Sequence, residues 1–98
     1  MDREQVLATL KAHEAELRRR GVAHAALFGS LARGEAGPGS DIDILVDISP
    51  DVPMGLFEYV AITQYVGDLF PIKTDVVERR GLKRFVRPNV ERDAVYAF

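Results

Sequence analysis

The chain contains no cysteine, and this absence excludes several classes of function at once. Disulfide bonds, thiolate metal sites and cysteine nucleophiles are all ruled out, which fits a reducing cytoplasm. No apolar run approaches the ~20 residues that a membrane-spanning helix needs. The charged residues 1–5 do not begin a signal peptide. We therefore expect a cytoplasmic protein without membrane contact.

The chain also lacks a strong excess of charge of either sign. It has 13 basic and 15 acidic residues, a net charge of −2. This balance argues against a strongly positive electrostatic potential over the protein surface, so we expect no direct binding of nucleic acid. With 98 residues, 47% of them hydrophobic, the chain is expected to form one domain, 1–98. Little room remains for a second domain that would hold a substrate.

Hydrophobic periodicity and turn residues predict alternating helices and strands. The first helix is expected over 3–19, with Asp2 as its N-cap and Gln5 completing a capping box. The other main elements are expected in these ranges: strands 22–28, 41–48 and 72–78, a helix over 55–69, and a final helix from Pro88 through Tyr96. This order predicts an α/β or α+β fold with helices packed on one sheet face.

Two patterns have both a structural and a functional interpretation. The apolar and aromatic residues of helix 55–69, among them Leu56, Phe57 and Val60, are expected in the core; a nucleobase platform is the alternative. The run Arg18 to Arg20 is expected to complement the C-terminal end of the first helix; contact with a phosphate or an acidic partner is the alternative.

Two acids stand two residues apart in the strand 41–48. Because strand side chains alternate, Asp41 and Asp43 point to one side, while Ile42 and Ile44 point to the other. A pair of carboxylates on one face either meets solvent or binds a cation.

A corner of small residues precedes this strand. Ser30 is expected to be the N-cap of a short helix over 31–34, whose free backbone N–H groups can bind a phosphate. Gly29 would let the phosphate approach the backbone closely. Arg33 lies one turn further along and could reach the same anion.

A third acid, Asp75, is expected on the strand 72–78, flanked by apolar neighbours. Three carboxylates that converge on one sheet face suit a hard divalent cation such as Mg²⁺. Two such ions would serve an in-line displacement at phosphorus, one activating a hydroxyl and one neutralising a triphosphate. These features together predict nucleotidyl transfer.

The same residues carry a family resemblance. Gly29-Ser30, ten intervening residues and then Asp41-Ile42-Asp43-Ile44 resemble the signature of the DNA polymerase β-like nucleotidyltransferase superfamily. The wider string most closely resembles the minimal nucleotidyltransferase (MNT) family, with Thr74–Val77 similar to its third-carboxylate strand and 87–96 to its closing helix. The resemblance implies a small mixed sheet with helices packed on one face.

The resemblance also implies site residues and a partner. Catalytic and metal-binding roles fall on three acids: Asp41, Asp43 and Asp75, with two Mg²⁺ ions and with Asp75 acting as the base or holding it. Nucleotide contacts fall on four residues: Gly29, Ser30, Arg33 and Ser40. The implied reaction moves AMP from ATP to a hydroxyl, a tyrosine, of a HEPN toxin, and the chain acts as the antitoxin in a hetero-oligomer.

Two other functions stay open at the level of sequence. The chain could neutralise a HEPN toxin by occlusion without catalysis. It could also be the catalytic subunit of a small-molecule nucleotidyltransferase of the aminoglycoside-modifying type, which needs a helical second chain. Its length favours an acceptor that arrives on another protein, because 98 residues offer a nucleotide pocket but little acceptor surface.

Overall fold

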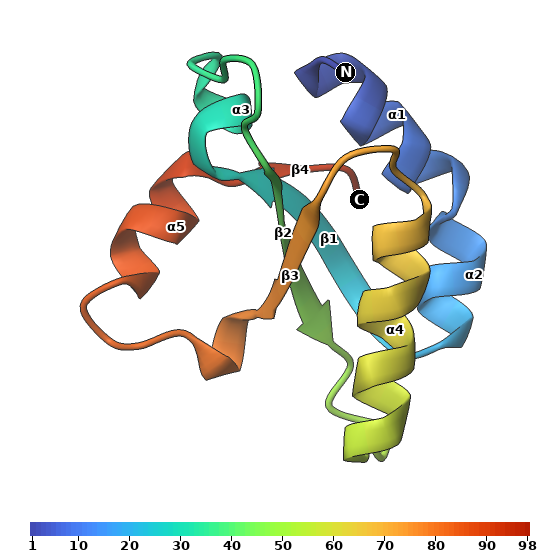
Figure 1. Ribbon diagram of the computed structural model, residues 1–98. Helices are drawn as coiled ribbons and strands as arrows, with labels where there is room; N and C mark the ends of the chain where they lie inside the picture. The colour runs from blue at the N-terminus through green and yellow to red at the C-terminus, as the bar shows by residue number, and fades with distance from the viewer.

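The structure, a computed structural model, describes all residues 1–98 as a four-stranded sheet with five α-helices (Figure 1). The strands lie in the order β3-β2-β1-β4. In chain order the elements are α1 (Arg3–Ala12), α2 (Glu14–Arg19), β1 (Val22–Phe28), α3 (Gly29–Arg33), β2 (Ile42–Ile48), α4 (Leu56–Asp68), β3 (Thr74–Glu78), the 3₁₀ turn η1 (Arg79–Gly81), α5 (Arg87–Asp93) and β4 (Val95–Tyr96). None of the helices combines the length and apolarity needed to cross a membrane.

The sheet is mixed, and its register is set around β2. β1 runs antiparallel to both β2 and β4, whereas β2 and β3 run parallel. A parallel pair needs a crossover connection, and α4 provides it between β2 and β3. The central position of β2 gives it strand neighbours on both sides, which fixes the direction of every β2 side chain.

The first predicted helix is divided in two. Asp2 accepts a hydrogen bond from the Gln5 backbone N–H at 2.8 Å, and the Gln5 side chain returns a bond to the Asp2 N–H, so the predicted capping box is confirmed. α1 ends at Ala12, however, because His13 leaves the helical conformation (φ −103°, ψ 14°). There its Nδ1 lies 2.8 Å from the Tyr65 hydroxyl of α4, a tertiary contact that periodicity does not reveal.

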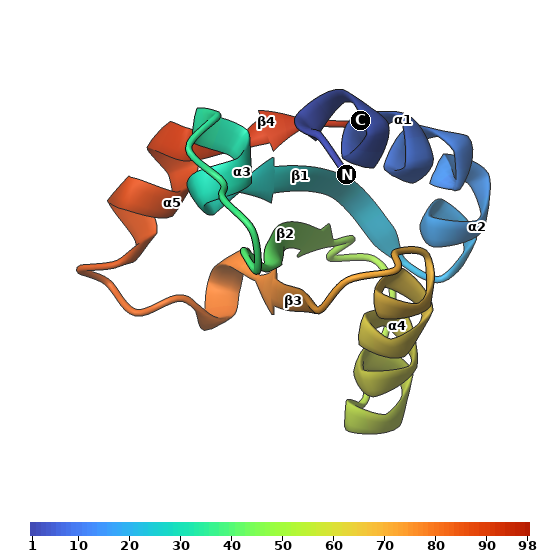
Figure 2. The same cartoon turned by 45° about the horizontal axis from the view of Figure 1, so that its top comes forward.

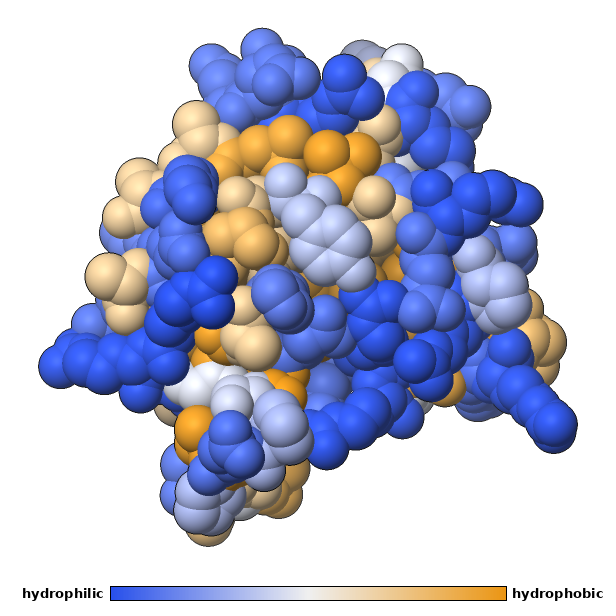
Figure 3. Space-filling view, turned by 180° about the vertical axis from the view of Figure 1, so that it is seen from behind, coloured by the Kyte–Doolittle hydropathy of each residue, from blue (hydrophilic) through white to orange (hydrophobic).

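The main core lies between the sheet and helices α1, α2 and α4 (Figure 1). Alternate residues of the strands point into it, in agreement with the predicted alternation, and the largest members have almost no exposed surface: Leu10, Leu17, Leu27, Ile42, Ile44 and Ile62. From behind, apolar surface is visible near the centre of the molecule, with hydrophilic side chains around it (Figure 3).

The prediction that the helices pack on one sheet face is wrong for α5, which lies on the opposite face (Figures 1 and 2). Val90 of α5 is buried against Ala26 of β1 and Leu45 of β2, and Leu82 packs beside them. Asp43 alternates with the core-facing Ile42 and Ile44, so it lies on the same face as Leu45 and α5. α5 therefore borders the sheet face that carries the acids.

The predicted final helix is too long. It ends at Asp93, since Ala94 is extended (φ −64°, ψ 129°), and Val95–Tyr96 pair with β1 as β4. A β-branched and an aromatic residue fit a pleated sheet edge, and the unpaired edge of β1 supplies backbone partners that no local pattern reveals. The start near Pro88 is confirmed, as Pro88 lies in the first turn of α5.

The predicted burial of the start of α4 is wrong. Leu56 and Phe57 are 74% and 87% exposed, and the buried residues of the helix are Ile62 and Val66. The N-terminal half of α4 projects past the end of the sheet (Figures 1 and 2), so its apolar side chains have no layer to pack against.

Arg79 ties β2, α5 and β4 together. Its Nε donates to Asp47 Oδ1 at 2.8 Å, and its other nitrogens bond Glu91 and the Tyr96 hydroxyl. Its side chain is 16% exposed. Hydrogen bonds with Asp47 raise the pKa of Arg79 beyond its usual range, so its charge is permanent.

We expect Arg79→Ala to lower the free energy of unfolding by about 2 kcal/mol, because Asp47 loses its only ion-pair partner in a partly buried site and Glu91 keeps only Arg87. The neighbouring Arg80→Ala is the matched control. Arg80 is 65% exposed and bonds only Glu78, so a loss within about 0.5 kcal/mol is expected. Urea denaturation measures both, and equal losses would contradict the assigned role of Arg79.

Candidate functional site

The three acids predicted from sequence lie at one end of the sheet. Asp43 of β2 and Asp75 of β3 are register partners on adjacent parallel strands, so their side chains share a face. Asp41 immediately precedes β2, two residues before Asp43, and continues the same alternation. The structure thus brings together residues that are 34 positions apart in the sequence (75 − 41).

Asp43 has the most perturbed carboxylate of the three. Burial raises the pKa of Asp43 above its ordinary value of 3.8, the negative charges of Asp75 and Asp41 raise it further, and Arg33 partly offsets them. Repulsion of this kind requires carboxylates that are close enough to interact. A cation at this position would relieve it.

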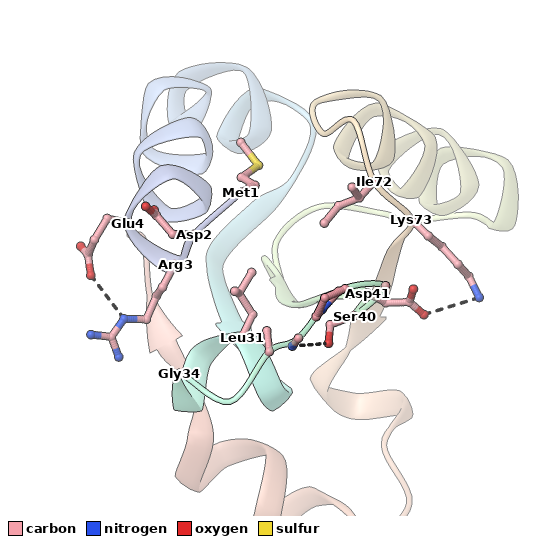
Figure 4. A pocket seen from close by; sticks show the side chains of 14 residues that line it. Met1, Asp2, Arg3, Glu4, Leu31, Gly34, Ser40, Asp41, Ile72 and Lys73 are labelled. Carbon is pink, nitrogen blue, oxygen red and sulfur yellow. Dashed lines mark hydrogen bonds and ion pairs between the residues drawn. The ribbon is translucent and has the colours of Figure 1, made fainter.

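The carboxylates are not gathered into a ready-made cluster of three metal ligands. Asp41 instead faces Lys73, whose Nζ lies 3.7 Å from Asp41 Oδ2 (Figure 4). Lys73 directly follows the Pro71-Ile72 turn and was not predicted as a site residue. The strand pattern placed Lys73 on the same face as Asp75, but its contact with Asp41 depends on the pairing of β3 with β2.

Gly29 permits the close approach of α3 to Asp43. A Cβ atom at position 29 would overlap Asp43 Oδ2 and lie 3.2 Å from its Cγ. Gly29 also has φ +78°, a left-handed conformation that strains any residue with a side chain. The sequence predicted that Gly29 lets a phosphate approach the backbone. In the structure the Asp43 carboxylate occupies this space.

The predicted N-cap role of Ser30 is wrong. α3 begins one residue earlier, at Gly29, with Phe28 in the cap position and no side-chain cap. Ser30 is the second residue of the helix, and its backbone carbonyl accepts from Glu35 N–H at 2.9 Å. The positive φ available to Gly29 lets the chain turn from β1 straight into α3, so no separate capping residue is needed.

Arg33 closes α3 and is held by two carboxylates. Its Nε donates to Glu35 Oε2 at 2.9 Å and its Nη1 to Asp93 Oδ2 at 2.8 Å. These hydrogen bonds raise the pKa of Arg33. Asp93 belongs to α5, 60 residues away, so α3 and α5 are joined beside the acids by a link that no sequence pattern indicated.

Ser40 shapes the loop that leads to Asp41. Its Oγ accepts from Gly37 N–H at 3.0 Å, and its own N–H donates to Gly37 O at 3.1 Å. A cavity of about 840 Å³ lies beside this loop, between the N-terminus of α1 and the residues before β3 (Figure 4). Ser40, Asp41 and Lys73 line it, but Asp43 and Asp75 do not, so the cavity reaches only one of the three acids.

The donor set defines what this end of the sheet can bind. Carboxylate oxygens are the ligands of hard divalent cations, and Mg²⁺ in particular uses one or two carboxylates together with phosphate oxygens. Gly29 keeps the space beside Asp43 free of a side chain. These residues therefore fit Mg²⁺ bound together with a phosphate-bearing ligand.

Comparison with known proteins supports the same chemistry. A family model described as a nucleotidyltransferase domain matches residues 10–97. The chain belongs to this family. This nucleotidyltransferase is 38% identical over 94 residues to the protein adenylyltransferase MntA of Thermococcus cleftensis, an alignment that covers 95% of this chain and 93% of the relative. The prediction of an enzyme that transfers nucleotidyl groups is confirmed.

Solved structures place the nucleotidyltransferase in the polymerase β-like fold. It matches a protein described as a candidate minimal nucleotidyltransferase with a TM-score of 0.78 and 33% identity, over 97% of this chain and 95% of that one. It also shares its fold with the MNT antitoxin that was solved in complex with the tri-AMPylated Shewanella oneidensis HEPN toxin (TM-score 0.63, 17% identity, 94% and 71% covered). The predicted family and fold are therefore confirmed.

Proposed function

We propose that this nucleotidyltransferase transfers AMP from ATP to a tyrosine hydroxyl of a HEPN toxin and so acts as a cytoplasmic antitoxin. The observation that carries the proposal is the pairing of Asp43 with Asp75 on adjacent strands, beside a glycine whose missing Cβ lets the Asp43 carboxylate lie against the start of α3. Similarity to a protein adenylyltransferase over 95% of the chain supports a protein acceptor.

In this proposal Asp41, Asp43 and Asp75 hold two Mg²⁺ ions. Asp41 gives up its ion pair with Lys73 when the ions bind. When bound, Mg²⁺ neutralises the triphosphate and lowers the pKa of the acceptor hydroxyl. Gly29 and Ser30 bind the phosphates through their backbone N–H groups. Arg33 and Ser40 lie beside the same phosphates, with Arg33 fixed by Asp93 and Ser40 fixed by its turn.

The reaction forms a bond between the acceptor oxygen and the α-phosphorus of ATP. The bond from that phosphorus to the β-phosphate oxygen breaks, pyrophosphate leaves, and Asp75 receives the hydroxyl proton. An acceptor hydroxyl arriving from solvent can reach Asp75, because Asp75 is the exposed member of the pair and Asp43 is partly buried. Catalysis then depends on positioning and on electrostatic stabilisation of the charge at phosphorus.

The acceptor hydroxyl has to come from a second protein. The α5 side of the sheet is only partly covered, and Asp75 is exposed, so a bulky acceptor can reach it. A hetero-oligomer with the HEPN toxin would complete the enzyme. In the same complex the toxin would be neutralised by modification.

The test incubates the purified chain with the product of the adjacent reading frame as the candidate HEPN acceptor, together with Mg²⁺ and ATP labelled at the α-phosphate. We expect label on a tyrosine of the HEPN protein, located by mass spectrometry. Asp75→Asn should reduce the rate by about 10²-fold or more, since it removes the proton acceptor. Asp68→Asn, an exposed acid at the end of α4, is the matched control and should leave the rate unchanged.

Other outcomes separate the remaining functions. Full neutralisation of the toxin by Asp41→Asn/Asp43→Asn without label would replace the proposal by neutralisation through occlusion. Label that appears only on an aminoglycoside would indicate a small-molecule transferase. Label on the protein at a serine or threonine would correct the acceptor but keep the reaction.

A further inference from the structure

The segment that joins η1 to α5 carries positive charge that the chain does not neutralise. Residues 80–87, here called the basic loop, contain four basic residues and no acidic one. The other 90 residues contain nine basic (13 − 4) and 15 acidic residues, a net charge of −6. The basic loop projects from the body of the molecule in both ribbon views (Figures 1 and 2).

The pairing of charges sets the basic loop apart from the other basic run of the chain. Arg18, Arg19 and Arg20 all form ion pairs with Glu14 or Glu16 of their own helix, so the structural interpretation of that run is confirmed. In the basic loop, Lys83 and Arg84 form no ion pair, and both are exposed. The flanking Arg80 and Arg87 pair only with neighbours, Glu78 and Glu91.

The basic loop also exposes apolar side chains on an ordered base. Phe85 is 77% exposed and Val86 36%. Below them the backbone is fixed, since the N–H groups of Val86 and Arg87 both donate to Lys83 O at 3.0 Å, and Leu82 packs against the buried cluster of Ala26, Leu45 and Val90. A rigid aromatic tip binds with little loss of conformational entropy.

The position of the basic loop suits a large partner. β3 leads from Asp75 to Arg79 in four steps of about 3.3 Å, so the loop begins roughly 13 Å from the acids along the strand. That separation is too great for a second contact to the same phosphates. It is well within the footprint of a protein that presents a hydroxyl at Asp75.

From these observations we infer that the basic loop docks an acidic surface of the acceptor protein, with Phe85 seated in an apolar socket at its centre. The inference rests on the proposed function, because it names where the acceptor of that reaction is held. An aromatic anchor within a charged rim is the arrangement of many protein interfaces. A nucleic acid carries negative charge along its whole length and would be repelled by the rest of the chain, whereas a protein can present acidic residues to the basic loop alone.

The test compares Lys83→Glu/Arg84→Glu with Lys11→Glu/Arg19→Glu, which changes two exposed basic residues on α1 and α2. With the HEPN protein of the adjacent reading frame as acceptor, the basic-loop variant should raise the KM for that protein about tenfold or more and flatten the salt dependence of association. Its kcat and its KM for ATP should stay within about twofold. Phe85→Ala should raise the same KM without changing the salt dependence.

Each result has a defined meaning. If the wild-type chain neither modifies nor binds the HEPN protein, the proposed function fails and the inference fails with it. If the wild-type chain is active and the KM for the HEPN protein is unchanged in the basic-loop variant, the inference alone is overturned. Tight binding of a labelled single-stranded RNA that depends on Lys83 and Arg84 would overturn it in favour of a nucleic-acid surface. Circular dichroism and melting curves confirm that the variants are folded.

Discussion

Asp43→Asn is expected to lower AMP transfer by about 10³-fold while leaving the metal-free protein at least as stable as the wild type. Activity is lost because the amide cannot hold Mg²⁺ as the carboxylate does. Stability is retained because the charge of Asp43 opposes folding: its pKa is raised in the folded state by burial and by the charges of Asp75 and Asp41. Label transfer and thermal melting measure the two effects.

The sign of this second effect follows from proton linkage. An acid whose pKa is raised on folding binds its proton more tightly in the folded state, so stability falls as the pH rises from 3.8 through the folded-state pKa. At neutral pH the ionised Asp43 is therefore destabilising without metal, and Asp43→Asn should melt at an equal or higher temperature. Asp51→Asn, in the exposed turn after β2, is the control and should change neither property. A melting temperature of Asp43→Asn well below that of the wild type would contradict the crowded-carboxylate site.

Gly29→Ala should lower AMP transfer by about 10²-fold or more and also reduce stability, because its Cβ would displace the Asp43 carboxylate. Two costs add at this position. The left-handed backbone alone costs about 1–2 kcal/mol for a residue with a side chain. The overlap with Asp43 Oδ2 is specific to position 29 and acts on the site itself.

Gly34→Ala separates the two costs. Gly34 has nearly the same backbone conformation as Gly29, φ +75° against +78°, but a Cβ there meets nothing within 4 Å. Gly34→Ala should therefore lower the free energy of unfolding by a similar amount through backbone strain and keep most of the activity. Steady-state rates and urea denaturation of both variants test this, and equal losses of activity would show that strain, rather than the approach to Asp43, explains the effect of Gly29→Ala.

The sequence predicted those parts of the molecule that depend on local patterns. Alternation placed Asp41 and Asp43 on one face because a strand side chain has only two directions, whereas the position of Asp75 beside them depends on the register of β3 with β2. The capping box of Asp2 and Gln5 and the strand 22–28 are local as well, and the structure confirms both. The spacing from Gly29 to Asp43 carried the family resemblance, and the comparisons confirm that family.

The remaining features depend on contacts between distant segments. Val95 and Tyr96 became a strand because the edge of β1 was free, and Leu56 and Phe57 are exposed because the sheet ends before α4 does. The bond between Arg33 and Asp93 and the contact of Lys73 with Asp41 depend on where the loops bring each pair together. Propensity and periodicity carry no information about such pairs.

The parallel pairing of β2 with β3 limits the insertions and deletions that this chain can accept. Thr74 and Val76 pair with the core-facing Ile42 and Ile44, so Asp75, one residue from each, points to the opposite face together with its partner Asp43. Inserting or deleting one residue within β3 would place a threonine or a valine opposite Asp43 and turn Asp75 toward the core. An insertion or deletion in the turn 49–55 does not change the face to which Asp75 points. The site is therefore compatible with insertions in that turn but not in β3.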